Sequence, residues 1–283
     1  MLATRVTNAE QTRTFAANRA TGHIALSVSA HDGITRRTRV HEDGSLRVRF
    51  PNATPEALEA VLVNTGGGMT GGDRFSIEMD VGEGASLIAG TAAAEKIYRS
   101  SGTEAEMDVR LMLAQGARLA WLPQETILFD RARLRRRIEI DLAEDASLIL
   151  AEAVVFGRAA MDEAMAEGFF TDAWRIRRGG KLIYADTARL DGAIAERMAQ
   201  RAVTHGGIAI ATVLVAPGGD GQLEQVRALG ETLEGGFSGE VGISAWNGLA
   251  VARLCAKDGA ALRHDLVAVL AALGTTVPRL WLQ

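Results

Sequence analysis

Apolar and polar residues alternate along much of the chain with a period of two. Residues 46–50, 75–81 and 107–113 all show this alternation. It is longest over 131–142, where charged residues occupy one face and apolar residues occupy the other. A β-strand with one buried face and one hydrated face produces this period. The pattern therefore predicts a series of half-buried strands.

One charged residue breaks the longest alternating run. Arg136 falls on the apolar side of that strand, between Leu134 and Ile138. An unpaired charge inside a protein is strongly unfavourable. We therefore expect Arg136 to meet an opposite charge or to reach water.

A short pattern recurs at a spacing of roughly thirty residues, in the range of stacked supersecondary units. It is Gly-Ala-Ser-Leu at 84–87, Gly-Ala-Arg-Leu at 116–119 and Asp-Ala-Ser-Leu at 145–148, with a looser copy at 179–182. Each copy indicates a turn and then a strand. Unless the recurrence is a coincidence, it predicts β-sheets that coil in a helix-like manner. The expected fold class is mainly β: a layered, helix-like stack of β-sheets (α+β overall) with a few C-terminal helices.

The C-terminal third changes character. Its periodicity predicts helices at 194–203, 223–233 and 260–273, and strands at 208–215 and 241–246. Glycine pairs separate these pieces, as expected for breaks between elements.

The chain has 283 residues, of which 47% are hydrophobic, and it contains no Ser/Pro-rich linker. This composition is sufficient for a buried core. We expect a single domain over 1–283, with a β body at about 20–190 and a mixed helix and strand portion at about 191–283.

Charge and cysteine content narrow the class of protein. The formal net charge is -4, so bulk charge attracts neither nucleic acid nor an anionic membrane. Cys255 is the single cysteine, which excludes an intrachain disulfide and fits a reducing compartment. Residues 1–20 lack the apolar stretch of a secretory signal, and no apolar run is long enough for a membrane span. These features predict a cytoplasmic protein.

Patterns typical of enzymes are missing from the sequence. It contains no G-x-S-x-G, H-E-x-x-H or C-x-x-C, and its five histidines are scattered. We therefore expect neither a catalytic centre nor a stable structural metal site. Cys255 follows an apolar run, which is typical of an inert core thiol. The arginines at 131–137 alternate strictly, which favours a hydrated strand face or a protein-docking surface over nucleic-acid binding.

A glycine-rich segment at 64–74 contains a literal G-x-G-x-x-G at positions 66, 68 and 71. A dinucleotide site needs a helix after these glycines, whereas the pattern here continues as a strand. Two interpretations remain: a turn that needs positive φ angles, and a close backbone approach that exposes the end of the segment at a surface or channel mouth. We favour the second. The candidate site residues are Asn64, Gly67, Gly68, Gly71, Gly72, Asp73 and Arg74.

Two further segments carry polar residues among small or apolar ones. In residues 91–100 the candidates are Lys96, Tyr98 and Arg99, which are equally consistent with ordinary strand and turn positions. In residues 121–130, Glu125 lies between large apolar residues. It is either a buried, hydrogen-bonded structural carboxylate or a group that lines a passage. The other candidates in this segment are Trp121, Pro123 and Gln124.

The last segment contains Glu152, followed by the apolar residues 153–156 and then by Gly157 and Arg158. In one interpretation, Glu152, Gly157 and Arg158 are part of a functional site. The other is an internal ion pair between Glu152 and Arg158.

Together these four segments resemble the UreD (also called UreH) family of urease accessory proteins. WLPQE-x-I-x-F at 121–129 and NTxGGxxGGDR at 64–74 carry most of the resemblance, which is good over roughly residues 20–200. Two departures stand out. Glu95 occupies a position where the family usually has a small hydroxyl residue, and Met161-Asp162-Glu163 replaces the more usual Gly-Glu.

The resemblance implies a mainly β, non-catalytic scaffold. Such a protein binds apo-urease and recruits UreF and, through UreF, the GTPase UreG, so that Ni²⁺ reaches a urease active site whose lysine becomes carbamylated. It implies no stably bound cofactor, no nucleic acid and no membrane partner, and it leaves a homodimer within the accessory complex open. The missing P-loop is consistent with GTP hydrolysis by UreG.

A physical mechanism follows from this resemblance. Imidazole or thiolate sites would trap nickel, whereas carboxylates and carbonyls around a polar passage would bind it transiently. We hypothesise a nickel route inside the β body lined by Asp73, Glu125 and Glu152, with Lys96 as a gate or charge balance. The alternatives are a generic β-repeat interaction scaffold, unrelated to nickel, and a nucleotide-dependent enzyme that uses Gly66 to Gly71.

Overall fold

The computed structural model describes residues 19–51, 57–158, 161, 163–275 and 277–282. Most of the N-terminal segment on which the argument about a secretory signal depends lies outside these residues, as does Asp162. Within the described part of the chain, no helix has the length and apolar character needed to cross a bilayer.

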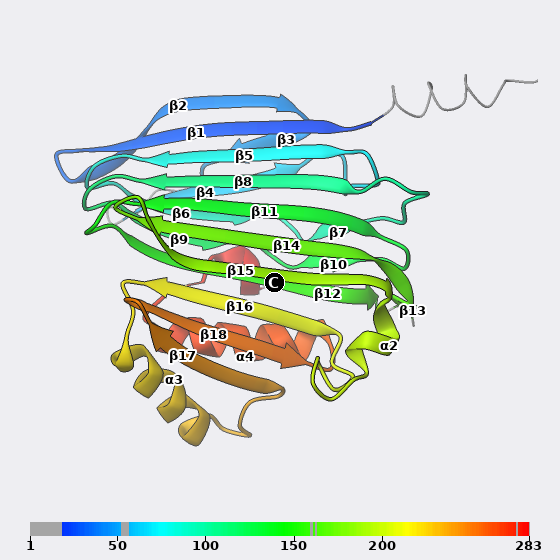
Figure 1. The fold of residues 1–283 in the computed structure, drawn as a ribbon. Coiled ribbons are helices and arrows are strands. Elements are labelled where there is room, and N and C mark those ends of the chain that lie inside the picture. The colour runs from blue at the N-terminus through cyan, green and yellow to red at the C-terminus, as the bar shows by residue number, and fades with distance from the viewer. Residues whose placement is uncertain (1–18, 52–56, 159–160, 162, 276, 283) are drawn as a thin grey trace, which may run out of the picture.

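The strands form two sheets, which Figure 1 shows as two layers. The first sheet, in the order β15-β14-β11-β8-β5-β1-β2, contains β1 (Thr21–His31), β2 (Ile34–Gly44), β5 (Arg74–Val81), β8 (Ala105–Leu113), β11 (Arg133–Leu142), β14 (Glu167–Arg178) and β15 (Lys181–Ala193). The main path of the second sheet, β17-β18-β16-β12-β9-β6-β4-β3, contains β3 (Leu46–Arg49), β4 (Leu58–Asn64), β6 (Ser86–Thr91), β9 (Arg118–Leu122), β12 (Ser147–Arg158), β16 (Ala209–Ala216), β17 (Glu240–Trp246) and β18 (Leu249–Ala256). Beside that path lie β7 (Glu95–Ile97), β10 (Thr126–Leu128) and β13 (Glu163–Ala164).

The chain passes back and forth between the two sheets, which gives the helix-like coil that the repeat predicts. From β5 to β14 successive long strands belong alternately to the first and the second sheet, and neighbouring coils pair in parallel. The repeated leucines lie in register, Leu87 beside Leu119 and Leu119 beside Leu148. The repeat is therefore the turn at which each coil enters the second sheet, and its leucine stacks on the leucines of neighbouring coils.

The looser fourth copy of the repeat does not continue this coil. At 179–182 the chain turns back, and β15 pairs antiparallel with β14 in the same sheet. A second antiparallel hairpin, β1–β2, forms the opposite edge of that sheet. Two glycines with positive φ, Gly179 and Gly180, make the tight turn possible. The parallel part of the first sheet is thus closed at both edges by hairpins.

The C-terminal portion extends the second sheet and covers it with helices. Strand β16 pairs antiparallel with β12, and β18 and β17 continue the sheet. Helices α3 (Asp220–Thr232) and α4 (Gly259–Ala272) confirm two of the three predicted helices. Helix α2 (Ile194–Met198) is shorter than predicted, because the chain enters hydrogen-bonded turns that end at Gly206 and Gly207. A short 3-10 helix, η2 (Arg279–Leu282), follows α4.

The apolar side chains form two cores. The larger lies between the two sheets, and the smaller lies between the second sheet and the C-terminal helices. Strands β5, β8 and β11 alternate between buried and more exposed positions as predicted. Strand β18 is buried along most of its length, and Cys255 near its end is half-buried rather than a fully enclosed core thiol.

Candidate functional site

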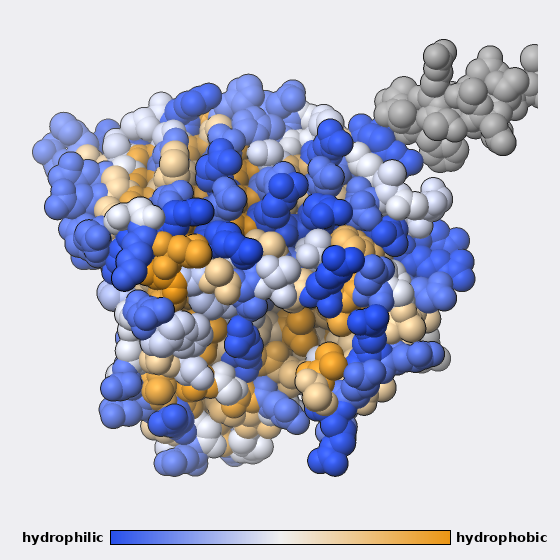
Figure 2. Space-filling model, viewed as in Figure 1, coloured by the Kyte–Doolittle hydropathy of each residue, from blue (hydrophilic) through white to orange (hydrophobic). Residues whose placement is uncertain are grey.

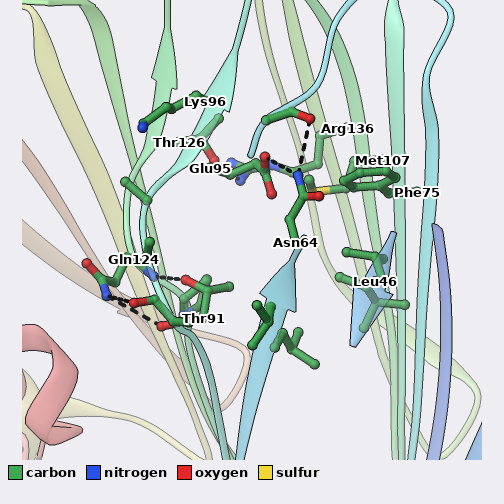
Figure 3. Close-up of a pocket in the computed structure, with 18 of the residues that line it drawn as sticks. Leu46, Asn64, Phe75, Thr91, Glu95, Lys96, Met107, Gln124, Thr126 and Arg136 are labelled. Atoms are coloured by element: carbon green, nitrogen blue, oxygen red, sulfur yellow. Dashed lines mark hydrogen bonds between the residues drawn. The ribbon is translucent and has the colours of Figure 1, made fainter. Parts of the chain in front are cut away.

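A cavity of about 150 Å³ lies between the two sheets (Figure 3). Its apolar wall comes from both layers and includes Leu46, Phe75, Met107 and Trp121. The sequence segments that carried the family resemblance supply most of its polar wall. These polar residues are Asn64, Thr91, Glu95, Lys96, Gln124, Thr126, Arg136 and Glu152.

Glu95, on β7, is one of the carboxylates that line this cavity. The Asn64 side-chain amide donates to Glu95 Oε1 at 2.9 Å and to the Gly68 carbonyl at 3.2 Å (Figure 3). Burial raises the pKa of Glu95 to about 7, because an ionised carboxylate loses hydration there. Near neutral pH the protonated and the ionised forms of Glu95 are therefore both populated. Lys96, the next residue on β7, is solvent-exposed although it also lines the cavity.

A buried cluster of three charges lies beside the cavity, and two of its members, Arg136 and Glu152, line the cavity. The Arg136 guanidinium donates to both carboxylate oxygens of Asp172, from Nε at 3.0 Å and from Nη2 at 2.6 Å. Its Nη1 donates to Glu152 and, at 3.3 Å, to the Thr126 hydroxyl. Trp121 Nε1 donates to the other oxygen of Glu152 at 2.7 Å. The expectation that Arg136 needs an opposite charge is confirmed, and it has two.

This cluster has one formal positive and two formal negative charges. Arg136 is only 2% exposed, and Glu152 and Asp172 are also buried. Burial raises the pKa of Glu152, and the charge of Asp172 adds to that effect, although Arg136 opposes it. The cluster therefore has one excess negative charge when both carboxyl groups are ionised.

A second cavity of about 50 Å³ lies on the other side of the cluster. Arg136 and Glu152 line both cavities. Beyond the second cavity is an open groove of about 590 Å³, which shares Asp186 and several residues of β16 with it. Figure 2 shows a hollow with apolar walls in the lower half of the face that is turned toward the viewer. The two cavities and the groove thus lie in series.

A second ion pair lies where the small cavity meets the groove. Arg253 of β18 donates to Asp186 of β15 at 2.7 Å, and the Tyr184 hydroxyl donates to the same carboxylate oxygen at 3.1 Å. Burial, reinforced by the charge of Asp186, raises the pKa of Tyr184 to about 12. The contact joins an edge strand of the first sheet to a strand of the second.

Two of the four residues hypothesised to converge on one passage lie elsewhere. Asp73 accepts hydrogen bonds from the Ala20 and Thr70 amides at 2.9 and 2.7 Å, so it fixes the turn before β5. Glu125 forms an ion pair with Arg263 of α4, with Nε at 2.8 Å from Oε1. Neither lines the cavity, whereas Lys96 and Glu152 both do. The predicted convergence is therefore wrong for Asp73 and Glu125.

The hypothesised ion pair between Glu152 and Arg158 is also wrong. Glu152 lies in the middle of β12 and Arg158 at its end, roughly 20 Å away along an extended strand. Arg158 instead pairs with Glu163 and lies 4.1 Å from the centre of the Phe129 ring. Gly157 before it has φ +100°, so it permits the close approach of β13.

The glycine-rich loop has the positive φ angles and the close backbone approaches that the sequence predicted, but at its end only Arg74 is exposed, whereas Asp73 is buried. Gly67, Gly68 and Gly72 have positive φ angles. A side chain at Gly68 would come within 2.7 Å of the Lys96 carbonyl, and one at Gly71 would overlap Ser100. The loop leads into β5 and not into a helix, which removes the structural basis of the dinucleotide interpretation. Arg74, at the start of β5, is exposed and lies 3.5 Å from Glu106.

The other candidate residues hold the surrounding loops together. The Tyr98 hydroxyl donates to the Gly67 carbonyl at 3.0 Å, and the Arg99 carbonyl accepts from Thr70 at 2.9 Å. The Gln124 side chain donates to the Ala92 carbonyl at 3.1 Å. Pro123 lines the cavity beside Gln124. These contacts join the three loop segments at 64–74, 91–100 and 121–130 into one wall.

A serine, a histidine and an aspartate also meet near α4. Ser238 Oγ and Asp265 Oδ1 both approach His264 Nδ1, at 3.4 and 3.1 Å. A proton relay needs the two partners on different ring nitrogens. Asp265 is buried and accepts from the Ser238 and Gly239 amides, so it fixes that loop. Among the described residues, no group of three or more His, Cys, Asp or Glu is arranged to hold a metal ion.

The family model and the related proteins that match this chain all carry the same family name. The family model described as UreD urease accessory protein matches residues 20–282. A protein of Rhodopseudomonas palustris (strain BisA53) named urease accessory protein UreD is 55% identical over 276 residues, which cover 98% of this chain and 95% of the relative. Proteins of the same name from R. palustris (strain HaA2) and Bradyrhizobium diazoefficiens are 56% and 54% identical, over 98% and 95% of this chain and 98% and 96% of their own lengths.

Proposed function

The chain belongs to the UreD family of urease accessory proteins, and we propose that it is a non-catalytic scaffold through which nickel passes to apo-urease. The series of two internal cavities and a groove carries this proposal. In its partner complex the scaffold binds apo-urease and UreF, and through UreF it meets UreG, which supplies GTP hydrolysis. Nickel is cargo in this process and not a resident cofactor.

The donor atoms around the cavities suit a cargo that must leave again. Glu95 lines the first cavity, Asp172 lines the second and Glu152 lines both. Among the described residues, no histidine or cysteine lines either cavity. Oxygen ligands bind divalent transition metals more weakly than imidazole or thiolate ligands do. The proposed route therefore differs from the one that the sequence suggested: Glu95 and Asp172 replace Asp73 and Glu125.

The experiment that tests this proposal is nickel-dependent activation of urease by the reconstituted accessory complex. Glu95→Gln removes a carboxylate from the first cavity and keeps the size of the side chain. We expect the partner complex to form normally and urease activation at limiting Ni²⁺ to fall by at least about tenfold, because even the loss of a residue that only supports a metal ligand lowers metal affinity or activity about tenfold to a hundredfold. Glu139→Gln, on the outer face of β11, is the matched control and should activate like the wild type.

Full activation by Glu95→Gln in a normally assembled complex would contradict the nickel route. The scaffold part is tested separately, by co-purification of the chain with UreF and apo-urease. Normal urease maturation in cells that lack the chain would remove both parts and would favour a β-repeat scaffold unrelated to nickel.

A further inference from the structure

A hydrogen bond between two side chains, Arg136 and Glu152, lies where the two internal cavities meet. Among the residues that the structure describes, Arg136 and Glu152 are the two that line both cavities. Arg136 comes from β11 of the first sheet, and Glu152 comes from β12 of the second. Their hydrogen bond therefore spans the space between the layers. It is not part of either sheet, so breaking it disturbs no backbone pairing.

The two carboxylates hold Arg136 in different ways. Asp172 lies directly opposite Arg136 in the parallel β11–β14 pair, and it accepts from two guanidinium nitrogens. Glu152 accepts from the third nitrogen alone, across the gap between the sheets. A bidentate pair on adjacent strands is more strongly constrained than a single contact between layers. The Asp172 contact is thus the anchor, and the Glu152 contact is the part that can be exchanged.

Glu152 is prepared to accept a different cation. Trp121 fixes one of its oxygens from the cavity side of β9, and Arg136 occupies the other. A divalent cation attracts a carboxylate with twice the charge of a guanidinium. Such a cation would compete with Arg136 Nη1 for Glu152, while the guanidinium keeps its two contacts to Asp172. After the cation moves on, the tethered guanidinium returns to the carboxylate.

We propose that Arg136 is a positioning residue that gates the two cavities, and that the divalent cation opens the gate by replacing the guanidinium at Glu152. This inference rests on the nickel route proposed above. Arg136 then has two effects on the cargo. It closes the passage when no cation is present, and it competes for Glu152, which keeps the cation from being trapped.

The test measures Ni²⁺ binding by the purified full-length chain, with NiCl₂ as the probe, for Arg136→Met and Arg136→Lys. Without the competing guanidinium, we expect Arg136→Met to bind Ni²⁺ at least about tenfold more tightly and to release it to a chelator more slowly. Arg136→Lys keeps the charge but lacks the planar fork that reaches both carboxylates. Its affinity for Ni²⁺ should therefore lie between those of the wild type and Arg136→Met. Urease activation by both variants should fall although their nickel binding is tighter.

A purely structural role for Arg136 gives the opposite sign. If the guanidinium only supports the cavity, both variants should bind Ni²⁺ as weakly as the wild type or more weakly. That result would refute the proposal that Arg136 gates the two cavities. Arg137→Met is the matched control, because the neighbouring residue on β11 faces outward and lines neither cavity. It should leave nickel affinity unchanged. Thermal unfolding of each variant shows whether it is folded, and Arg136→Lys decides the matter if Arg136→Met is not.

Failure of the gate and failure of the nickel route give different results. If the wild-type chain binds Ni²⁺ and only the effect of Arg136 is missing, the gate is wrong and the route remains. If the wild-type chain and Glu95→Gln show no nickel binding and equal urease activation, the route is wrong and the gate falls with it.

Discussion

Arg136 and Arg137 are neighbours on β11, and they have opposite surroundings. Arg136 is 2% exposed and is held by two buried carboxylates, whereas the Arg137 side chain is 54% exposed and pairs with Asp108 at 3.1 Å. The pleat of the strand alone separates them. On the inner face of β11 an arginine thus connects two buried carboxylates. On the outer face the next arginine forms a single ion pair that is exposed to water and therefore weak.

The outer face of the first sheet is balanced locally. Arg110 of β8 lies between Glu78 of β5 and Glu139 of β11, at 4.0 and 3.8 Å. Arg133 and Arg135 approach Glu104, at 2.7 and 3.8 Å. The arginines that the sequence concentrates in β11 are therefore distributed among acidic neighbours, which supports the predicted hydrated strand face.

Breaking the buried cluster should have the largest effect. Asp172→Ala leaves the guanidinium of Arg136 without its bidentate partner, and we expect a loss of about 3–5 kcal/mol in the free energy of unfolding. Asp108→Ala removes the partner of Arg137 on the other face and should lose less than about 1 kcal/mol. Urea denaturation measures both. Equal losses would show that the two faces of β11 do not differ as described.

A pH titration sharpens the same comparison. The folded protein raises the pKa of Glu95 from 4.5 to about 7, so the folded state holds more protons than the unfolded state between these values. Wild-type stability should therefore fall as pH rises through that window. Glu95→Gln removes this loss, and its advantage over the wild type should grow from near zero at low pH to at most about 3 kcal/mol above pH 7.

Glu163→Gln should show the opposite sign in that titration. The hydrogen bond from Arg158 lowers the pKa of Glu163, so this carboxylate contributes stability above its unfolded pKa and loses it as pH falls through the folded value. The variant should be less stable than the wild type near neutrality, and the difference should vanish in acid. Denaturant unfolding from about pH 8 down to acid well below the unfolded pKa of 4.5 gives both curves; parallel curves would contradict the environment described for Glu95.

The smallest change in stability is expected for the ion pairs that Arg110 forms with Glu78 and Glu139 on the outer face of the first sheet. Arg110→Ala removes two long contacts between exposed charges, and we expect a change below about 0.5 kcal/mol. Added salt should reduce that change further, because exposed charges are screened. Thermal unfolding at low and high salt measures it. A loss comparable to that of Asp172→Ala would mean that the exposed ion pairs of Arg110 contribute substantially to the stability of the fold.

The sequence predicted the half-buried elements well because their alternation reports which face meets water. Strands β5, β8 and β11 follow the predicted ranges, and the first three repeat copies mark the turns into β6, β9 and β12. Strand β18 was not predicted, because the second sheet has the first sheet on one side and helices on the other, so its central strands show little alternation.

The candidate site was only partly predictable for a different reason. The sequence showed that Arg136 needed a partner, but its partners lie 16 and 36 residues away on two different strands. No local spacing encodes which coils become neighbours. Glu95 was noticed as a departure from the family pattern, and its place in the cavity could not be inferred, because its burial depends on the loop that contains Asn64 and Gly68.

The hydrogen bond from Trp121 to Glu152 gives the molecule an optical reporter at its centre. The indole ring lies beside the carboxylate that would receive the cation, since Nε1 and Oε1 are 2.7 Å apart. A paramagnetic ion at that carboxylate would quench the fluorescence of the ring. If nickel binds there as proposed, its arrival and departure would change the contribution of Trp121 to the emission of the four tryptophans, and a Trp121→Phe variant would identify that contribution.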